Sequence, residues 1–379
     1  MKQLDRDNNI LKAFFTLIRA GLWEEKVDIS DFGEIDFGSI NTLAEEQSVV
    51  GLLTAGIENI NDVKVPKELT LLFVGQTIQI EQQNRAINEF IAKLIQKLRH
   101  ADIYTLLIKG QGIAQCYERP LWRASGDVDL LLSDVNYRKA IPVITNIAGS
   151  VEEENMYNRH IAMTVEDWMV ELHGTLRSGL WKTLDSELDK VQKALFYDGK
   201  VRSWMDENTQ IFLPHQDEDV LYVFSHILQH FYQEGVGLRQ ICDWCRLLWT
   251  YKNSLNKKLL ETRLCDAGIM TEWKAFGALA VEYLGMPEEA IPFYSSNRRW
   301  SRKAKKIIGF ILETGNFGHN RDYSYQDKYP YIVYKTISLW KHLKDGAFFF
   351  SIFPLDSIKV TWRRMIVGFS VAIKGKRHE

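Results

Sequence analysis

The chain has 379 residues, of which 46% are hydrophobic and 25% are charged, as in an average globular protein. This composition excludes a disordered chain, a collagen-like chain and a disulfide-dense miniprotein. The 47 basic and 49 acidic residues give a net charge of −2, which excludes a global basic field for coating nucleic acid. At roughly 100–200 residues per domain, the length allows two or three domains, or one core with large elaborations.

No segment for export or for crossing a membrane is expected. Residues 1–15 carry charges throughout and lack the apolar centre of a secretory signal. The longest apolar run, residues 347–353, ends at Pro354 and is far shorter than the roughly 18 residues that span a bilayer. In such a chain the cysteines are expected to be reduced thiols of a cytoplasmic protein. They are Cys116, Cys242, Cys245 and Cys265.

Residues 1–100 are predicted to form an N-terminal helical region. Between Ile10 and Ile18, apolar residues recur at the spacing of one face of an amphipathic helix. Residues 41–57 and 69–99 show the same helical pattern.

From residue 101 to residue 176 the pattern changes to short apolar runs typical of strands. The predicted elements are, in order, a strand at 104–108 that enters a tight turn, a short helix at 111–117, a strand at 127–132, a helix through 140–147, and a hairpin of strands at 158–165 and 168–172. This order predicts a small α/β unit.

Helical periodicity returns after residue 181 and predicts a C-terminal helical region over 177–379. The clearer helices cover residues 219–231, 238–251, 255–267, 271–284 and 298–314. The predicted fold class is therefore α+β, with a small mixed β-sheet core embedded in a mostly helical protein.

Asp127 and Asp129 are separated by one residue in a predicted strand, so both carboxylates leave the same face. Two like charges on an apolar strand repel each other and are costly to bury. A divalent cation would offset this cost, and carboxylate oxygens suit Mg²⁺. The alternative is that one aspartate caps a loop and the other is solvated where the strand starts.

Two neighbouring features favour the metal interpretation. The strand that ends at Lys109-Gly110 is followed at once by a helix, which places backbone N–H groups where a phosphate could bind. Glu171 lies in another apolar strand, and its carboxylate could complete a triad around one or two metals. Otherwise Glu171 is an ordinary residue at the edge of a sheet, in water.

The segments L-I-K-G … Y … R … G-D-V-D-L-L-L and V-E-L-H together resemble the DNA polymerase β-type nucleotidyltransferase superfamily. They are most similar to its branch of uncharacterised nucleotidyltransferases. The resemblance covers roughly residues 80–250, and the sharp motifs lie within residues 108–133 and 170–173.

The resemblance implies transfer of a nucleoside monophosphate from an NTP such as ATP to a hydroxyl or similar acceptor, with release of pyrophosphate. Asp127, Asp129 and Glu171 match the carboxylates that bind two Mg²⁺ ions in this superfamily. Glu171 would ligate the metal beside the acceptor and help to take its proton. His173 shares the face of Glu171 and could supply the base instead.

The resemblance also assigns residues to phosphate binding. Gly110 matches the turn glycine of the superfamily, and Lys109 and Arg123 match basic positions that could neutralise phosphate charge. The alternative for both cations is an ordinary ion pair with a sheet carboxylate. The superfamily usually has Gly-Gly or Gly-Ser at this turn, whereas this chain has Gly110-Gln111-Gly112, without a hydroxyl.

Two residue pairs have the spacing of metal-binding or redox sites. His226 and His230 lie four apart on a predicted helix, but no glutamate follows His226, so helix packing or substrate contact is preferred to zinc binding. Cys242 and Cys245 form C-x-x-C within an apolar helix, where buried thiols are the default.

Basic residues gather near the C-terminus. Residues 335–379 hold nine Lys or Arg against three Asp or Glu, and residues 298–306 add six basic residues. Solvated helix faces are the preferred interpretation, and contact with an anionic membrane surface or with nucleic acid is the alternative. Arg239 and Asp243 lie at a predicted helix start that could face the cleft.

Two functions follow from these observations. The first is a Mg²⁺-dependent nucleotidyltransferase that acts on a small molecule, a glycan or a peptide. The alternative is a catalytically idle protein that keeps the fold and binds a partner through its helical region. The complete carboxylate set favours the enzyme, and the altered glycine turn favours the idle protein.

Overall fold

The computed structural model describes residues 2–156, 158–321, 328 and 331–373. The helices are α1 (Lys2–Trp23), α2 (Phe37–Glu46), α3 (Val50–Glu58), α4 (Lys67–His100), α5 (Gly110–Ala114), α6 (Asp134–Thr145), α7 (Lys182–Tyr197), α8 (Gln216–Gln233), α9 (Leu238–Tyr251), α10 (Lys257–Ala267), α11 (Met270–Leu284), α12 (Arg298–Thr314), α14 (Tyr331–Phe350) and α15 (Pro354–Ile373). The strands are β1 (Thr105–Leu107), β2 (Val128–Leu132), β3 (Ser150–Val151), β4 (His160–Val165), β5 (Trp168–His173), β6 (Val201–Asp206) and β7 (Thr209–Pro214). The predicted α+β fold class is confirmed.

The main sheet has the strand order β1-β2-β5-β4-β3. β2 pairs with β5 in parallel, and the other neighbouring strands are antiparallel. All five residues of β2 are buried, because β2 lies inside the sheet and is covered on both faces. The register pairs Asp129 of β2 with Glu171 of β5. Two carboxylates far apart in the sequence are thus neighbours on one face of the sheet.

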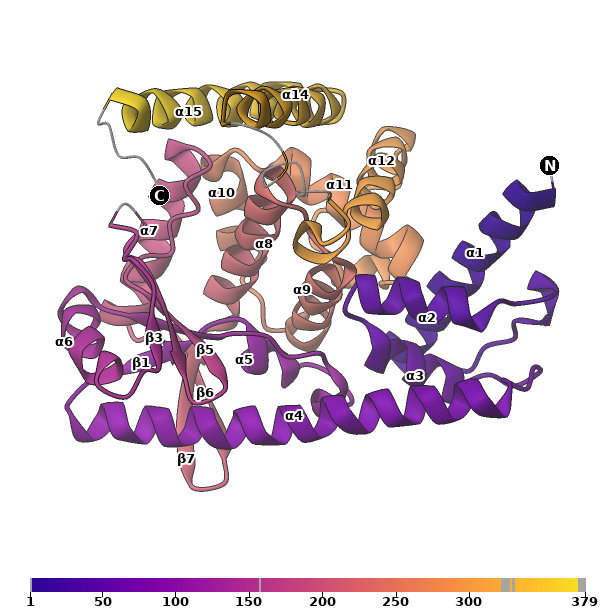
Figure 1. Cartoon of the computed structure of the whole chain (residues 1–379), viewed down its shortest axis with the longest axis horizontal. Helices are drawn as coiled ribbons and strands as arrows, with labels where there is room; N and C mark the ends of the chain where they lie inside the picture. Colours follow the sequence, from indigo (N-terminus) through magenta and orange to yellow (C-terminus); the bar gives the residue numbers. More distant parts are fainter. Residues whose placement is uncertain (1, 157, 322–327, 329–330, 374–379) are drawn as a thin grey trace.

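The long helix α4 runs along one side of the molecule, past α3 at one end and past the strands at the other (Figure 1). Its C-terminal half buries an apolar face that includes Ile87, Phe90 and Leu94, in one cluster with Leu130 of β2 and Leu213 of β7. This spacing of three and four residues is the apolar stripe of a helix that covers a core. Helix α4 and strand β7 therefore both pack against the main sheet in this cluster.

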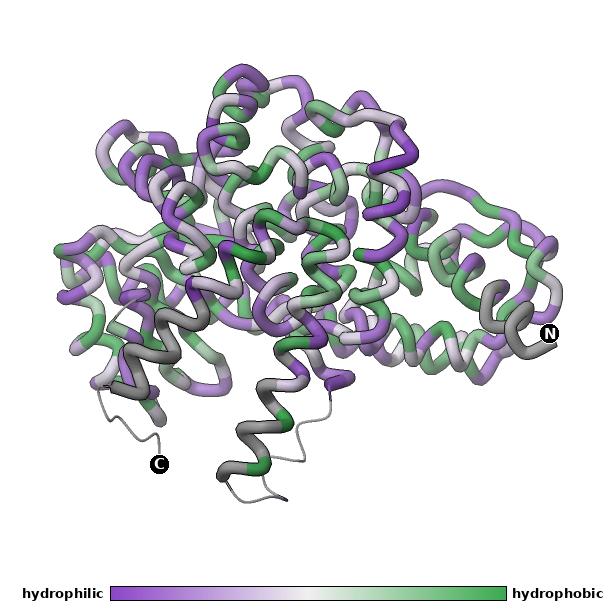
Figure 2. Tube along the Cα trace, turned by 90° about the horizontal axis from the view of Figure 1, so that it is seen from above, coloured by the Kyte–Doolittle hydropathy of each residue, from purple (hydrophilic) through white to green (hydrophobic). Residues whose placement is uncertain are grey.

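A second core joins the two ends of the chain. It contains residues of α1, such as Phe14, together with residues of α8, α9 and α11, such as Trp244 and Trp273. Arg19 Nε donates to the carbonyl of Tyr283 at 2.8 Å, which ties α1 to α11 directly. Most helices carry both hydrophobic and hydrophilic residues along their length, as expected for a helix with one buried and one exposed face (Figure 2).

Several predicted boundaries are wrong. The single helical stretch predicted at 41–57 is two helices, α2 and α3, separated by a turn in which Ser48 has φ 55°. The helix predicted at 111–117 is shorter and starts at Gly110. The short strand β3 was not predicted.

The prediction that the chain is helical from residue 181 onward is wrong at the hairpin β6–β7. In β7, Ile211 and Leu213 are buried whereas Gln210 is exposed, which is the alternation of a strand. The two strands are joined by a tight turn in which Glu207 has φ 47°.

The basic C-terminal region falls on α14 and α15, except for residues 374–379, which lie outside the described residues. Large apolar side chains are exposed on these helices, among them Trp340, Leu355 and Trp362. Contact of this region with a membrane surface stays a prediction. Among the described residues, no helix combines the length and the apolar character needed to cross a bilayer.

Candidate active site

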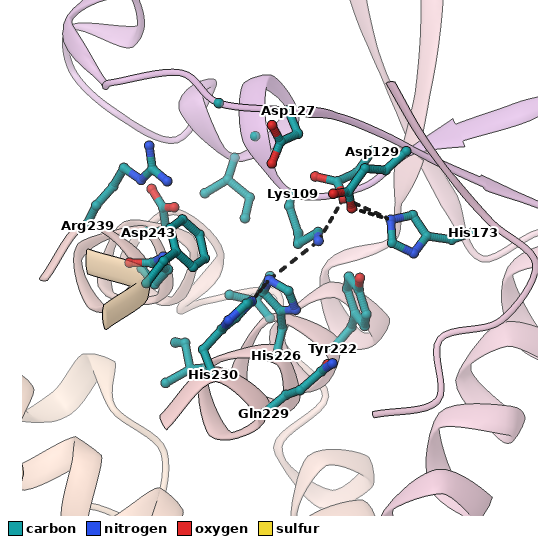
Figure 3. Close-up of a pocket in the computed structure, with 18 of the residues that line it drawn as sticks. Lys109, Asp127, Asp129, His173, Tyr222, His226, Gln229, His230, Arg239 and Asp243 are labelled. Atoms are coloured by element: carbon teal, nitrogen blue, oxygen red, sulfur yellow. Dashed lines mark hydrogen bonds and ion pairs between the residues drawn. The ribbon is translucent and has the colours of Figure 1, made fainter. Parts of the chain in front are cut away.

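A cavity of about 650 Å³ opens between the sheet, the start of α5, and helices α8 and α9 (Figure 3). Residues 316–319, which follow α12, close part of its wall. Every residue that the sequence assigned to metal or phosphate binding lines this cavity. These residues are Lys109, Gly110, Arg123, Asp127, Asp129 and Glu171.

Three carboxylates line the sheet side of the cavity. Asp129 is buried, Glu171 is half-buried on the neighbouring strand, and Asp127 is exposed just before β2. Loss of water around the Asp127 carboxylate, together with the charges of Glu171 and Asp129, raises the pKa of Asp127. Loss of water is the larger cause, and the two neighbouring carboxylates add to it.

Two histidines contact these carboxylates. His173 Nε2 lies 2.9 Å from Asp129 Oδ1 and 3.3 Å from Glu171 Oε2, and His160 Nε2 lies 3.1 Å from the same Glu171 oxygen. Burial opposes ionisation of Glu171, but the hydrogen bonds to His160 and His173 outweigh it and hold the pKa of Glu171 well below its usual range. Burial likewise opposes charge on His173, and its bonds to Asp129 and Glu171 outweigh it, so the pKa of His173 is raised.

His160 is a site residue that the sequence reasoning missed. The two-residue turn at Glu166-Asp167 pairs Val165 with Trp168, and the same register places His160 opposite His173 at the far end of the hairpin. The hairpin was predicted, so its register could have revealed this pair. The ligand atoms of His160, Glu171 and His173 lie within 4.8 Å of one another, close enough to hold a metal ion.

Lys109 lies at the centre of the cavity wall (Figure 3). Its Nζ donates to Asp129 Oδ1 at 2.8 Å and lies 3.4 Å from His226 Nε2. Burial opposes the charge of Lys109, but the carboxylate of Asp129 outweighs it and raises the pKa of Lys109. The backbone of Lys109 has φ 60° and ψ −153°, a conformation that costs a non-glycine residue about 1–3 kcal/mol. Such strain is typical of turns at functional sites.

The unusual turn Gly110-Gln111-Gly112 leaves the cavity unobstructed. Gln111 is buried on the other side of the turn, where its Nε2 donates to Asn88 Oδ1 of α4 at 2.6 Å. At Gly112, an added Cβ would lie 2.8 Å from Leu213 Cδ2 of β7. Gln111 and Gly112 therefore serve packing against α4 and β7, and Gly110 alone of the three lines the cavity.

Arg123 is held by α9 instead of a sheet carboxylate. Its Nε and Nη2 each donate to Asp243 at 2.7 Å, and Tyr117 Oη donates to the same carboxylate at 2.7 Å. Nη1 donates to the carbonyl of Ala124 at 3.1 Å. Three of the five guanidinium N–H groups are thus used within the protein, and the side chain is fixed where it lines the cavity.

The face of α8 toward the cavity carries His226 and His230, as Figure 3 shows. Their Nε2 atoms are 3.0 Å apart, and His230 Nδ1 lies 3.2 Å from Glu234 Oε2. Burial, with the nearby charge of Lys109, lowers the pKa of His226 well below its usual range, so this ring is neutral.

Cys242 and Cys245 are buried in α9, as the sequence indicated. Burial raises the pKa of both thiols, which therefore stay protonated at neutral pH.

A family model described as "Uncharacterised nucleotidyltransferase" matches residues 33–285, which is more than half of the chain. No curated protein and no solved structure matches the chain at a significant level. The matched range includes both strands that carry the carboxylates and both helices that face them. The chain therefore belongs to the uncharacterised nucleotidyltransferase family.

Proposed function

We propose that the protein transfers a nucleoside monophosphate from an NTP to a hydroxyl or similar acceptor and releases pyrophosphate. The observation that carries this proposal is that Asp127, Asp129 and Glu171 line one cavity together with the Lys109-Gly110 turn. Membership of a nucleotidyltransferase family supports the same reaction class.

The three carboxylates fit divalent metal ions. Loss of water, and then the charges of Glu171 and Asp129, raise the pKa of Asp127, so a bound cation would offset costs that the carboxylate otherwise bears. Asp127 and Asp129 would hold Mg²⁺ together, and Glu171 would add a ligand from the neighbouring strand. Bound Mg²⁺ would stabilise the charge that develops on the transferred phosphate and promote ionisation of the acceptor hydroxyl.

The remaining residues would position the nucleotide. The Gly110 backbone has no side chain in the way of a phosphate, and Lys109 offers an ammonium that now contacts Asp129. Arg123 adds a fixed positive charge, because Asp243 holds its guanidinium in place. Glu171 and His173 lie together on the sheet side, where either would accept the proton of the acceptor.

The acceptor we propose is a small molecule, a glycan or a peptide. The net charge of −2 supplies no general attraction for nucleic acid. The idle-protein alternative rested on the altered glycine turn. Because Gln111 contacts Asn88 outside the cavity, its side chain does not obstruct a triphosphate, while the turn still supplies no hydroxyl.

A thermal-shift assay on the full chain tests this proposal against an idle protein. Mg²⁺ usually takes several ligands from substrate phosphates, so the carboxylates alone should bind it weakly. We expect the melting temperature to rise more with Mg²⁺ and the correct NTP together than the two separate shifts added. Simple additivity with all four common NTPs would contradict the proposal and favour a protein without metal-assisted catalysis.

A further inference from the structure

Most cations that line the cavity have a carboxylate partner, and Arg239 does not. Lys109 pairs with Asp129 at 2.8 Å, and Arg177 with Asp189 at 2.6 Å. Within the part of the chain that the structure describes, no carboxylate oxygen lies within 4.0 Å of the Arg239 guanidinium.

The contacts of Arg239 are with backbone and with one ring. Nη1 donates to the carbonyl of Ala124 at 3.1 Å and lies 3.5 Å from that of Ser125. Phe317 places its ring 5.9 Å from the guanidinium carbon. Arg239 Nε is buried and has no hydrogen-bond partner among the described residues.

This arrangement is unfavourable for the protein alone. The guanidinium is half-buried, and a cation partly removed from water is stabilised by a partner of opposite charge. The charge of Arg123 acts against it, and the charges of Asp243 and Asp127 act for it without an ion pair. Burial, and then the charge of Arg123, lower the pKa of Arg239 to about 10. An anion in the cavity would remove the imbalance.

The side chain is placed to reach the Asp127 side of the cavity. Arg239 is the second residue of α9, whose first turn is anchored because Leu238 N donates to Gln47 Oε1 at 3.0 Å. Its Nη2 lies 3.9 Å from the point where a Cβ on Gly126 would stand, one residue before Asp127. Figure 3 shows Arg239 at one end of the pocket, with Asp127 and Lys109 beyond it.

We propose that Arg239 binds the polyphosphate of the NTP. Its guanidinium would donate hydrogen bonds to oxygens of the outer phosphates, which lie beyond the phosphate next to Asp127. This inference rests on the proposed function. Asp129 holds Lys109, and Asp243 holds Arg123, so either would have to give up or share an ion pair to bind phosphate. Arg239 would gain a charged partner without losing one, and its planar fork suits two phosphate oxygens.

Calorimetric titration of the full chain with pyrophosphate, ATP and AMP, without metal, tests the inference. Arg239→Ala should weaken pyrophosphate and ATP binding by about 10–100-fold, the usual worth of hydrogen bonds to a charged group. AMP binding should change far less, because AMP lacks the outer phosphates. Arg239→Gln, which keeps a donor to Ala124, should show the same loss, so a folding defect in the alanine variant would not hide the result.

The matched control is Arg177→Ala. Arg177 lines the same cavity, but Asp189 neutralises it through two contacts of 2.7 and 2.6 Å. We expect this variant to bind pyrophosphate within about two-fold of wild type, the effect of a screened surface charge. An equal loss in both variants would overturn the inference and indicate a general effect of cavity charge.

Other outcomes separate the inference from the proposed function. If Arg239→Ala lowers the melting temperature but leaves the pyrophosphate affinity unchanged, Arg239 only clamps residues 124–125 and the inference is overturned. If it weakens AMP as much as ATP, the anion bound is a single phosphate and the assignment is wrong. If pyrophosphate binding depends on Arg239 while no nucleotide is ever transferred, the inference stands and the proposed function fails.

Discussion

Each residue of the carboxylate group has its own surroundings, so the two aspartates should respond differently to substitution. Asp127→Asn and Asp129→Asn should both abolish transfer, because a neutral amide cannot balance the charge of a metal ion. Asp127→Asn should leave the free energy of unfolding unchanged or raise it by up to about 0.5 kcal/mol, since it removes a crowded charge. Asp129→Asn should lower it by about 1–3 kcal/mol, because Lys109 and His173 lose their partner.

Denaturant unfolding and a transfer assay on the two variants check this prediction. Normal transfer in either variant would rule out the metal pair. Equal stability changes in both would show that Lys109 and His173 do not depend on Asp129.

Glu171 Oε2 and His173 Nε2 lie 3.3 Å apart, so either residue could take the proton of the acceptor hydroxyl. Separate substitutions distinguish the two. We expect Glu171→Gln to leave NTP affinity within a few-fold while transfer falls by about 10²–10⁴-fold, the worth of a positioned base. The reason is that Asp127 and Asp129 can still hold the metal that accompanies the triphosphate. Single-turnover kinetics with His173→Ala as the companion variant decide the case. Loss of chemistry in His173→Ala, with chemistry kept in Glu171→Gln, would make histidine the acceptor.

The sequence predicted site residues where the pattern is local. Asp127 and Asp129 share a face because strand side chains alternate, and this needs only the residues between them. The partner of Arg123 could not be predicted in the same way, because Asp243 belongs to a helix 120 residues further along the chain. The unpaired state of Arg239 also appears only when α9 is placed against residues 124–125.

At the scale of elements, the hairpin β6–β7 shows where helical periodicity misleads. β4 and β5 are equally short and were predicted, but β6 has no fully buried residue and its apolar Trp204 and Met205 are adjacent, so it lacks the alternation of a strand. β7 is buried because it joins the cluster formed by α4 and the sheet, and that contact lies far from it in sequence. Local residues therefore carried too little information for its prediction.

The contact between α5 and β7 gives a prediction about stability. Gly112→Ala should lower the free energy of unfolding by about 1–3 kcal/mol, because the new Cβ would lie 2.8 Å from Leu213 Cδ2. Combining it with Leu213→Ala should cost less than the two separate changes added, since the smaller side chain makes room.

The control is Gly75→Ala in α4, where nothing lies within 4 Å of the added Cβ. This change should raise the free energy of unfolding by about 0.5–1 kcal/mol, because alanine favours a helix. Denaturant unfolding of the four variants gives the comparison. Unchanged stability in Gly112→Ala would contradict the prediction and mean that the Leu213 side chain shifts away from α5 at little cost.

At the scale of the whole molecule, one buried carboxyl links α11 to α8 and to α15. Tyr232 Oη donates to Glu272 Oε1 at 3.2 Å, and Asp356 lies nearby at the start of α15. Burial, and then the charge of Asp356, raise the pKa of Glu272 well above its usual range. Helices α8, α11 and α15 are therefore held together partly by a protonated acid.

Stability should consequently fall as the pH rises. A group whose pKa is raised by folding contributes stability that is complete below its unfolded pKa and is lost as the pH passes its folded pKa. Melting temperatures from about pH 5 to about pH 8 should decline in the wild type and decline less in Glu272→Gln. A steeper decline in Glu272→Gln would contradict a protonated Glu272.

The proposed reaction transfers the nucleotidyl group of the NTP and not its terminal phosphate. The direct measurement incubates the full chain with Mg²⁺, a cell extract and an NTP labelled at either the α- or the γ-phosphate. We expect the α-label to appear in an acceptor and the γ-label to appear in pyrophosphate, and we expect Asp127→Asn to abolish both. Transfer of the γ-label to the acceptor, or unchanged transfer in Asp127→Asn, would contradict the proposed reaction.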